Sequence, residues 1–246
     1  MWDGKILFIG VVFALAGLVK GVIGLGLPTI SMGLLALTMM PLQAAAILVL
    51  PSFLTNVWQT AAGPSLMAAL RRLWPMLLGI CLGTWAGAGL MTSANPKYSG
   101  VLLGGALVIY ALTSFRAMKF SVQKTREPWL GPIVGALTGL ITAATGVFVI
   151  PAVPYLQGIG LEKEELVQAL GLSFTVSTLA LTINIARAGA LDVAVAAPTL
   201  VALAAACAGM WIGQILRVRL SPEVFRNCFF VGLLLLGVYL VIAAVR

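Results

Sequence analysis

The chain has 246 residues, of which 61% are hydrophobic and only 9% are charged. A soluble domain carries roughly 25% charged residues, so this composition excludes a water-soluble protein and indicates one that lies in a membrane. The net charge of +8 comes from basic residues scattered between apolar runs, which argues against a nucleic-acid partner. With no histidine and three cysteines in apolar runs, the chain is predicted to hold no metal and no cofactor and to be no enzyme.

Apolar segments follow one another along nearly the whole chain. Their lengths approach the roughly 20 residues that an α-helix needs to cross a bilayer, and their unbroken apolarity favours helices over a β-barrel. They are 5–20, 22–40, 43–61, 73–92, 98–117, 129–144, 146–160, 166–186, 191–215 and 227–245. The sequence predicts an all-α polytopic membrane protein with eight long helices, or ten if the short opening segments of each half are counted as spans or re-entrant helices.

The second half of the chain repeats the first. The matches are Gly17-x-x-x-Gly21 with Gly135-x-x-x-Gly139 at an offset of 118, Ser52-Phe53 with Ser173-Phe174 at 121, and Cys81-x-Gly-x-Trp-x-Gly with its copy from Cys207 at 126. Such a duplication is typical of membrane transporters. We therefore divide the chain into a first transmembrane repeat (1–118), a cytoplasmic linker (119–128) and a second transmembrane repeat (129–246).

The distribution of Lys and Arg favours an inverted relation between the halves. If each opening pair enters the membrane and returns, ten basic residues lie on the linker side and four on the other. If each opening pair is instead merged into one span, nine basic residues lie on one side of the membrane and five on the other. The positive-inside rule therefore favours the first arrangement. An odd number of passes per half makes the two halves inverted copies about an axis in the membrane plane.

Each half opens with helix breakers inside an apolar stretch. Gly24, Gly26 and Pro28 interrupt the first half, while Thr142, Thr145 and Gly146 occupy the corresponding stretch of the second. Broken helices at membrane depth leave free amide groups and positive dipole ends, which suit an anion. The alternative is that glycines here only allow close helix packing, and we favour it for the Gly17/Gly21 and Gly135/Gly139 pairs.

Polar side chains at membrane depth add to this candidate site. Lys20 is the one lysine inside an apolar block, where its charge requires water, a partner or a substrate anion, unless the side chain extends to the interface. In the third segment of each half, helical spacing places polar side chains on one face that cannot point at lipid. The candidate substrate-binding residues there are Ser52, Asn56, Gln59, Ser173 and Ser177.

The positions of the acidic residues indicate the charge of the substrate. All seven fall in predicted loops or segment ends, so no carboxylate is expected at membrane depth to relay protons or hold a cation. A path lined by amides, hydroxyls and one lysine favours a small anion.

The Gly-rich openings resemble the TauE/SafE family of sulfite exporters, within the toluene-sulfonate uptake permease group. Gly21-x-x-Gly24-x-Gly26 matches the signature of the first half, whereas Thr142, Ala144 and Gly146 depart from the Gly-Gly-Gly form of the second. The resemblance covers essentially the whole chain. It implies transport of sulfite, sulfoacetate or related sulfur-containing organic anions across the bacterial inner membrane.

The sequence therefore favours a multi-pass carrier for small anions, most of all sulfite or organosulfonates, that works by alternating access. Its expected partners are the anion and membrane lipid, and a homo-oligomer is left open. A channel-like anion path and an intramembrane scaffold that transports nothing are the alternatives. Transport direction and coupling ion are also left open.

Overall fold

The computed structural model describes residues 2–93, 96–115, 121–219 and 222–245. Eight helices in this part of the chain are long, and they are α1 (Trp2–Ile23), α3 (Pro41–Ala61), α4 (Leu66–Ala86), α6 (Pro96–Phe115), α7 (Glu127–Thr145), α9 (Lys163–Arg187), α10 (Ala196–Leu216) and α11 (Pro222–Val245). The short helices are α2 (Leu27–Leu35), α5 (Leu90–Ser93) and α8 (Ala152–Gly158), and the 3-10 turns are η1 (Lys124–Arg126) and η2 (Val193–Val195). The predicted all-α polytopic membrane protein is confirmed, and each of the ten predicted segments corresponds to a helix.

Seven of the long helices are long and apolar enough to cross a membrane, and α6 contributes a shorter apolar helix over Tyr98–Ser114. Large apolar side chains such as Leu7, Trp211 and Leu235 are exposed on the outer surface of the bundle. Lipid tails are as apolar as these side chains, so this exposure is stable in a bilayer. The chain is a multi-pass membrane protein.

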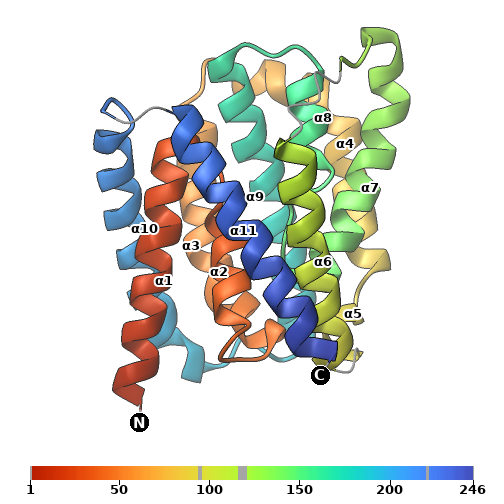
Figure 1. Cartoon of the computed structure of the whole chain (residues 1–246). Helices are drawn as coiled ribbons and strands as arrows, with labels where there is room; N and C mark the ends of the chain where they lie inside the picture. Colours follow the sequence, from red (N-terminus) through yellow and green to blue (C-terminus); the bar gives the residue numbers. More distant parts are fainter. Residues whose placement is uncertain (1, 94–95, 116–120, 220–221, 246) are drawn as a thin grey trace.

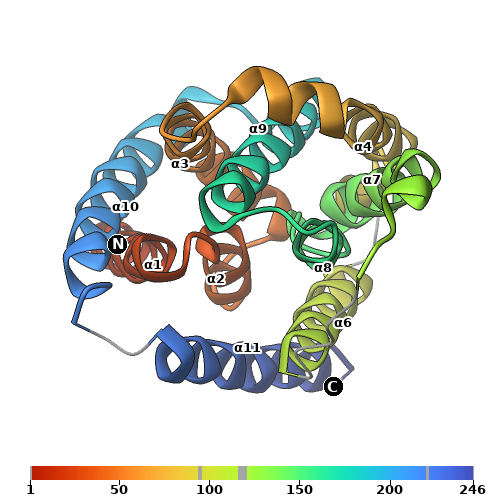
Figure 2. The ribbon, with the colours of Figure 1, turned by 90° about the horizontal axis from the view of Figure 1, so that it is seen from above.

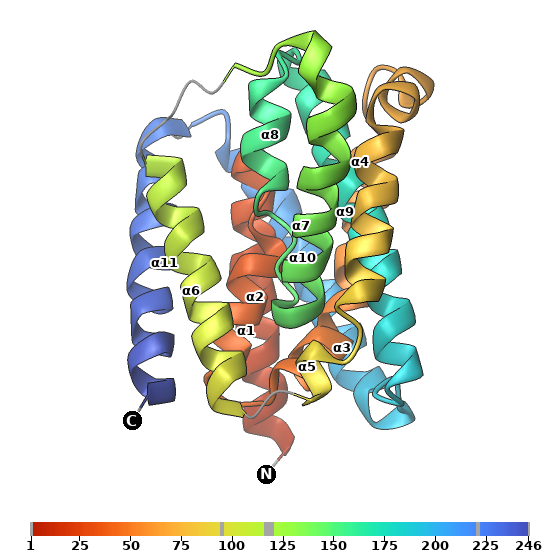
Figure 3. The ribbon, with the colours of Figure 1, turned by 90° about the vertical axis from the view of Figure 1, so that its right-hand side faces the viewer.

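The helices run alternately between two ends of the molecule (Figures 1 and 3). The first turn of α1 and the last turn of α11 lie at one end, which we call the terminal end, and residues 121–126 lie at the opposite end, which we call the linker end. The predicted linker 119–128 is only partly described, since residues 119 and 120 lie outside the described residues and Glu127 already begins α7.

The two short helices that follow the breaks lie in the middle of the bundle. Seen from above, α2 and α8 are surrounded by the long helices, and α9 lies beside them (Figure 2). Of the seven candidate spans, α9 and α3 are the most buried, at 61% and 56%. The most buried spans are therefore the two that carry the polar faces predicted from the sequence.

Glycines set the closest helix contacts. The main helix pairs are α1 with α10, α4 with α7, α6 with α11, and α3 with α9. A Cβ added at Gly17 would overlap the carbonyl group of Ala206, and one at Gly135 would overlap the carbonyl group of Met76. These glycines therefore serve close packing between helix backbones, as the small-residue spacing predicts.

Candidate functional site

Lys20 is buried in the last turn of α1, where only 3% of its surface is exposed. Its ammonium group donates hydrogen bonds to Thr55 Oγ1, at 3.0 Å, and to Asn56 Oδ1. Both partners lie on α3, so the lysine turns into the protein and does not extend to the lipid interface. An ammonium group has three N–H donors, and these two bonds leave one for a ligand.

The charge of Lys20 has no carboxylate partner in the described part of the chain. The one ion pair found there joins Arg72 of α4 to Glu127 of α7 at the linker end, with an N–O distance of 2.7 Å. A lysine charge costs about 2.5–3.5 kcal/mol at the centre of a membrane-spanning helix, and Lys20, in the last turn of α1, is buried although it is nearer the helix end. Two hydrogen bonds to neutral groups offset only part of that cost, so the site is electrostatically suited to an incoming anion.

The face of α3 that receives Lys20 is polar over two turns. Residues spaced by three and four positions share one face of a helix, and here Ser52, Asn56 and Gln59 are all buried. Asn56 Nδ2 donates to Ser52 Oγ at 3.4 Å, which orients the amide so that its oxygen accepts from Lys20. The predicted inward face is therefore confirmed, and it forms one hydrogen-bonded chain with the lysine.

Gln59 ties this face to the first helix break. Its side-chain amide donates to the carbonyl oxygen of Gly24 at 3.1 Å and to that of Val167 in α9 at 2.9 Å. Gly24 has φ +79°, in the left-handed region that favours glycine, and its carbonyl group is free for this bond because α1 ends just before it. The break between α1 and α2 is thus held against both α3 and α9.

A cavity of about 220 Å³ opens beside this network at the linker end. Buried Lys20 and Gln59 and half-buried Gly24 line its inner part, and exposed Lys163, Glu164 and Arg217 line its mouth. Water occupies about 30 Å³ per molecule in the liquid, so the volume suits a small oxyanion with part of its hydration shell. Three basic side chains and one acidic side chain give this cavity, which we call the linker-end cavity, a net positive lining.

Other predicted residues shape the breaks without lining this cavity. Gly26, with φ +113°, precedes α2 and lies against Val19 and Phe229, and Pro28 occupies the first turn of α2. Gly146, with φ +72°, ends α7 and lies against Met32 of α2. Their backbone geometry explains the helix interruptions.

The polar residues predicted for the second half are buried but largely satisfied within their own helices. Thr142 donates to the carbonyl oxygen of Thr138 at 2.7 Å, Thr145 to that of Ile141 at 2.7 Å, and Ser173 to that of Ala169 at 2.8 Å. Ser177, which aligns with Asn56 in the repeat, has a buried hydroxyl without a hydrogen-bond partner. The structure does not bring these side chains into hydrogen bonds with the Lys20 network.

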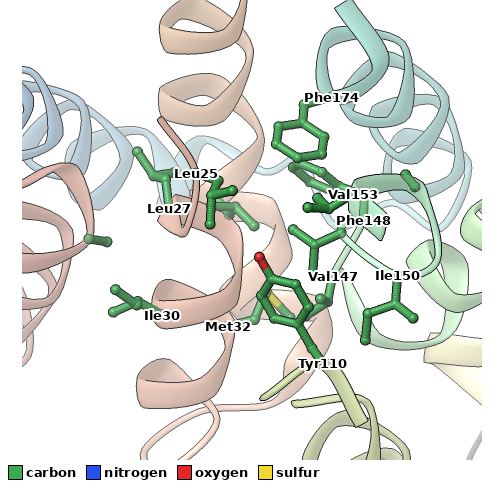
Figure 4. Close-up of a cluster of buried hydrophobic side chains, with 14 of the residues drawn as sticks. Leu25, Leu27, Ile30, Met32, Tyr110, Val147, Phe148, Ile150, Val153 and Phe174 are labelled. Atoms are coloured by element: carbon green, nitrogen blue, oxygen red, sulfur yellow. The ribbon is translucent and has the colours of Figure 1, made fainter. Parts of the chain in front are cut away.

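Apolar side chains fill the space between the two breaks (Figure 4). Leu25 comes from the first break and Leu27 from the start of α2, while Val147 and Phe148 come from the second break. Phe148 packs on Phe174 of α9 with ring centroids 5.2 Å apart, and the hydroxyl of Tyr110 points into the same region (Figure 4). That hydroxyl is buried without a partner.

Sequence reasoning missed several residues of this region. Gln168 of α9 bonds the carbonyl oxygen of Thr60 at 2.8 Å and accepts from the amide of Ser65 at 3.0 Å, which joins α9 to the end of α3. Lys163 and Arg217 begin or follow helices, so in the sequence they only signal which end of a helix is cytoplasmic. Their place at the mouth of one cavity depends on how distant helices pack.

A model of the family described as "Sulfite exporter TauE/SafE" matches residues 9–240 of the chain. The chain belongs to the TauE/SafE family. Comparisons with curated proteins and with solved structures returned no match. TauE/SafE is a transporter family, and the seven apolar spans fit membership in it.

Proposed function

We propose that this TauE/SafE protein carries sulfite or a small organosulfonate across the bacterial inner membrane by alternating access. The observation that carries the proposal is the buried amino group of Lys20, which has only neutral partners and lines a cavity whose mouth is basic. A bound anion would stabilise the charged form of this lysine. A carrier for a cation would instead place carboxylates there.

In this proposal the ammonium group of Lys20 contacts the anion, and Lys163 and Arg217 attract it to the mouth of the cavity. Gln59 lines the cavity and holds the first helix break in place, because both of its N–H groups bond the carbonyl oxygens of Gly24 and Val167. Ser52, Asn56, Ser173 and Ser177 supply the polar faces of α3 and α9 along which it passes. Gly24, Gly26, Pro28, Thr142, Thr145 and Gly146 form the breaks that move during the cycle. The apolar cluster around Phe148 closes the path in the present conformation.

We further propose that residues 1–118 and 129–246 are inverted repeats. The packing pattern supports this relation: exchanging the halves converts the α1–α10 pair into the α7–α4 pair and leaves the α3–α9 and α6–α11 pairs unchanged. In the ribbon, α1 runs from the terminal end to the linker end, and α7 runs in the opposite direction (Figure 3). Such a pair of halves suits alternating access around a central site.

The linker end is proposed to face the cytoplasm. Basic side chains described at that end are Arg71, Arg72, Lys124, Arg126, Lys163, Arg217, Arg219 and Arg226, against Lys5 and Arg187 at the terminal end. The side chains of Lys97, Arg116, Lys119 and Arg246 lie outside the described residues. Positive residues in short loops favour the cytoplasmic side, so the linker-end cavity would load its anion from the cytoplasm.

Transport itself is tested with the purified chain in lipid vesicles. We expect saturable flux of labelled sulfite, inhibited by isethionate and ethanesulfonate and unaffected by choline. The cavity lining recognises negative charge on a small oxyanion, which is the physical reason for this selectivity. Absence of flux for sulfite and for both sulfonates would contradict the proposal.

The sidedness is tested by labelling single cysteines in a chain whose three cysteines have been replaced by alanine. Gln123→Cys lies at the linker end and Lys5→Cys at the terminal end, and both positions are exposed. We expect an impermeant maleimide to label Lys5→Cys in intact cells and Gln123→Cys only after the membrane is opened. Labelling of both positions from the same side would refute the inverted arrangement.

A further inference from the structure

A second cavity of about 230 Å³ lies at the terminal end of the molecule. Its lining comes from the start of α3, the turn between α4 and α5, α5 itself, the end of α7 and the end of α9, and it includes Asn184 and Arg187. The linker-end cavity lies instead at the start of α9 and the ends of α1, α3 and α10. The two cavities are therefore at opposite ends of the molecule.

The internal repeat relates the two cavities. An offset of 121 residues takes Gly63 of the linker-end cavity to Asn184 of the second cavity, and Leu42 of the second cavity to Lys163 of the first. An offset of 126 takes Ala88 and Met91 of the second cavity to Gln214 and Arg217 of the first. These offsets are those of the sequence repeat itself, so the cavities are equivalent positions of the two halves.

Their charges differ, because the repeat preserves position and not residue type. Where the linker-end cavity has Lys163 and Arg217, the second has Leu42 and Met91. Among the described residues that line the second cavity, Arg187 is the one basic side chain and none is acidic. No ion pair among the described residues involves Arg187.

Asn184 gives this cavity an oriented polar group. Its side-chain nitrogen donates to the carbonyl oxygen of Thr84 at 2.7 Å, and because a carbonyl group can only accept, this bond fixes which end of the amide is the oxygen. That oxygen is buried and has no donor among the described residues. Buried polar atoms without a partner are uncommon, and because this one is an acceptor, the ligand that would satisfy it must carry a hydrogen-bond donor.

We propose that the terminal-end cavity is a second anion site on the outer side of the membrane, for a small singly charged oxyanion that also carries a hydroxyl group, such as a hydroxysulfonate or hydrogensulfite. Arg187 binds the anionic oxygens, and Asn184 Oδ1 accepts a hydrogen bond from the hydroxyl group. This inference rests on the proposed function. The terminal-end cavity has one basic side chain, whereas the linker-end cavity has three basic side chains and one acidic side chain. The outer site should therefore bind the anion more weakly than the linker-end site. Weaker binding at the terminal end would favour release there of an anion that is loaded at the linker end, while the concentration gradient and the membrane potential set the net direction of flux.

Flux measured from each face of the membrane tests the proposal. In right-side-out vesicles, Arg187→Gln should raise the half-saturation concentration for isethionate by about tenfold, as expected for loss of one charged contact. In inside-out vesicles the same variant should stay within about twofold of the wild type. Lys5→Gln removes a positive charge at the same end but outside the cavity. It should change neither value.

Protection from chemical modification tests binding without transport. Leu42→Cys, in a chain whose three cysteines have been replaced by alanine, places a thiol in the second cavity. Isethionate should slow its reaction with an impermeant maleimide, and Arg187→Gln or Asn184→Leu should remove this protection. Isethionate is the probe because sulfite itself adds to maleimides.

The outcomes separate the two proposals. Two results, in a chain that transports isethionate, would overturn the second site and leave the proposed function standing. One is an unchanged half-saturation concentration for Arg187→Gln in right-side-out vesicles, and the other is no protection of Leu42→Cys by isethionate. A wild-type chain that moves neither sulfite nor sulfonate from either face would overturn the proposed function and this inference with it.

Discussion

Replacing Lys20 with glutamine is expected to weaken anion transport strongly without damaging the fold. The variant keeps an N–H donor for Asn56 but removes the positive charge. A charged hydrogen bond contributes roughly 1.5–3 kcal/mol, so we expect the half-saturation concentration for sulfite from the linker end to rise roughly 10- to 100-fold. The measurement is initial flux into inside-out vesicles across a range of sulfite concentrations.

The stability of the same variant separates a functional lysine from a structural one. Burying an unpaired charge is costly, so Lys20→Gln should leave the thermal stability of the purified protein unchanged or raise it. Lys5→Gln is the matched control, because Lys5 is an exposed lysine on the same helix. If Lys20→Gln transports sulfite like the wild type, the lysine does not bind the substrate. The same conclusion follows if the variant loses much of its stability while the flux per folded molecule is unchanged.

Enlarging a packed glycine is expected to prevent folding. In Gly17→Leu and Gly135→Leu the new Cβ would overlap a backbone carbonyl group of the neighbouring helix, Ala206 in one case and Met76 in the other. Side chains can rotate away from a clash but a helix backbone must shift as a whole, so the cost should be about 3 kcal/mol or more. We expect little monodisperse protein from either variant on extraction in mild detergent.

Gly232→Leu is the control for this prediction, because nothing lies within 4 Å of a Cβ added at that position. Gly232 is also exposed, and leucine favours a helix more than glycine does. The variant should therefore extract like the wild type. Equal behaviour of Gly17→Leu and Gly232→Leu would contradict the close packing of α1 on α10.

Much of the fold could be predicted from sequence because the bilayer limits the choice of structure. Spans must be helical and about 20 residues long, and glycine and proline mark the breaks, so the predicted 22–40 and 146–160 segments correspond to α2 and α8. The short helix α5 was missed, because its four residues carry no periodic signal.

The candidate site could be predicted only where its residues are unusual for their surroundings. Lys20 stands out because a charge in an apolar block is costly, and the polar face of α3 follows from helical spacing. The hydrogen bonds from Lys20 to Thr55 and Asn56 depend on how the end of α1 is placed relative to α3, which local sequence does not specify. The same holds for Arg187 and Asn184, since the repeat becomes informative about them only once both cavities are located.

The central claim, that the two halves carry an anion by alternating access, is tested most directly by counterflow. Vesicles containing the wild-type chain are loaded with unlabelled isethionate and diluted into a trace of labelled isethionate. A carrier returns from each outward trip with a labelled molecule, so we predict transient accumulation of label above its equilibrium level, which Lys20→Gln should abolish. A simple rise to equilibrium without overshoot would indicate a channel-like path, and no uptake of label at all would indicate a protein that does not transport this class of anion.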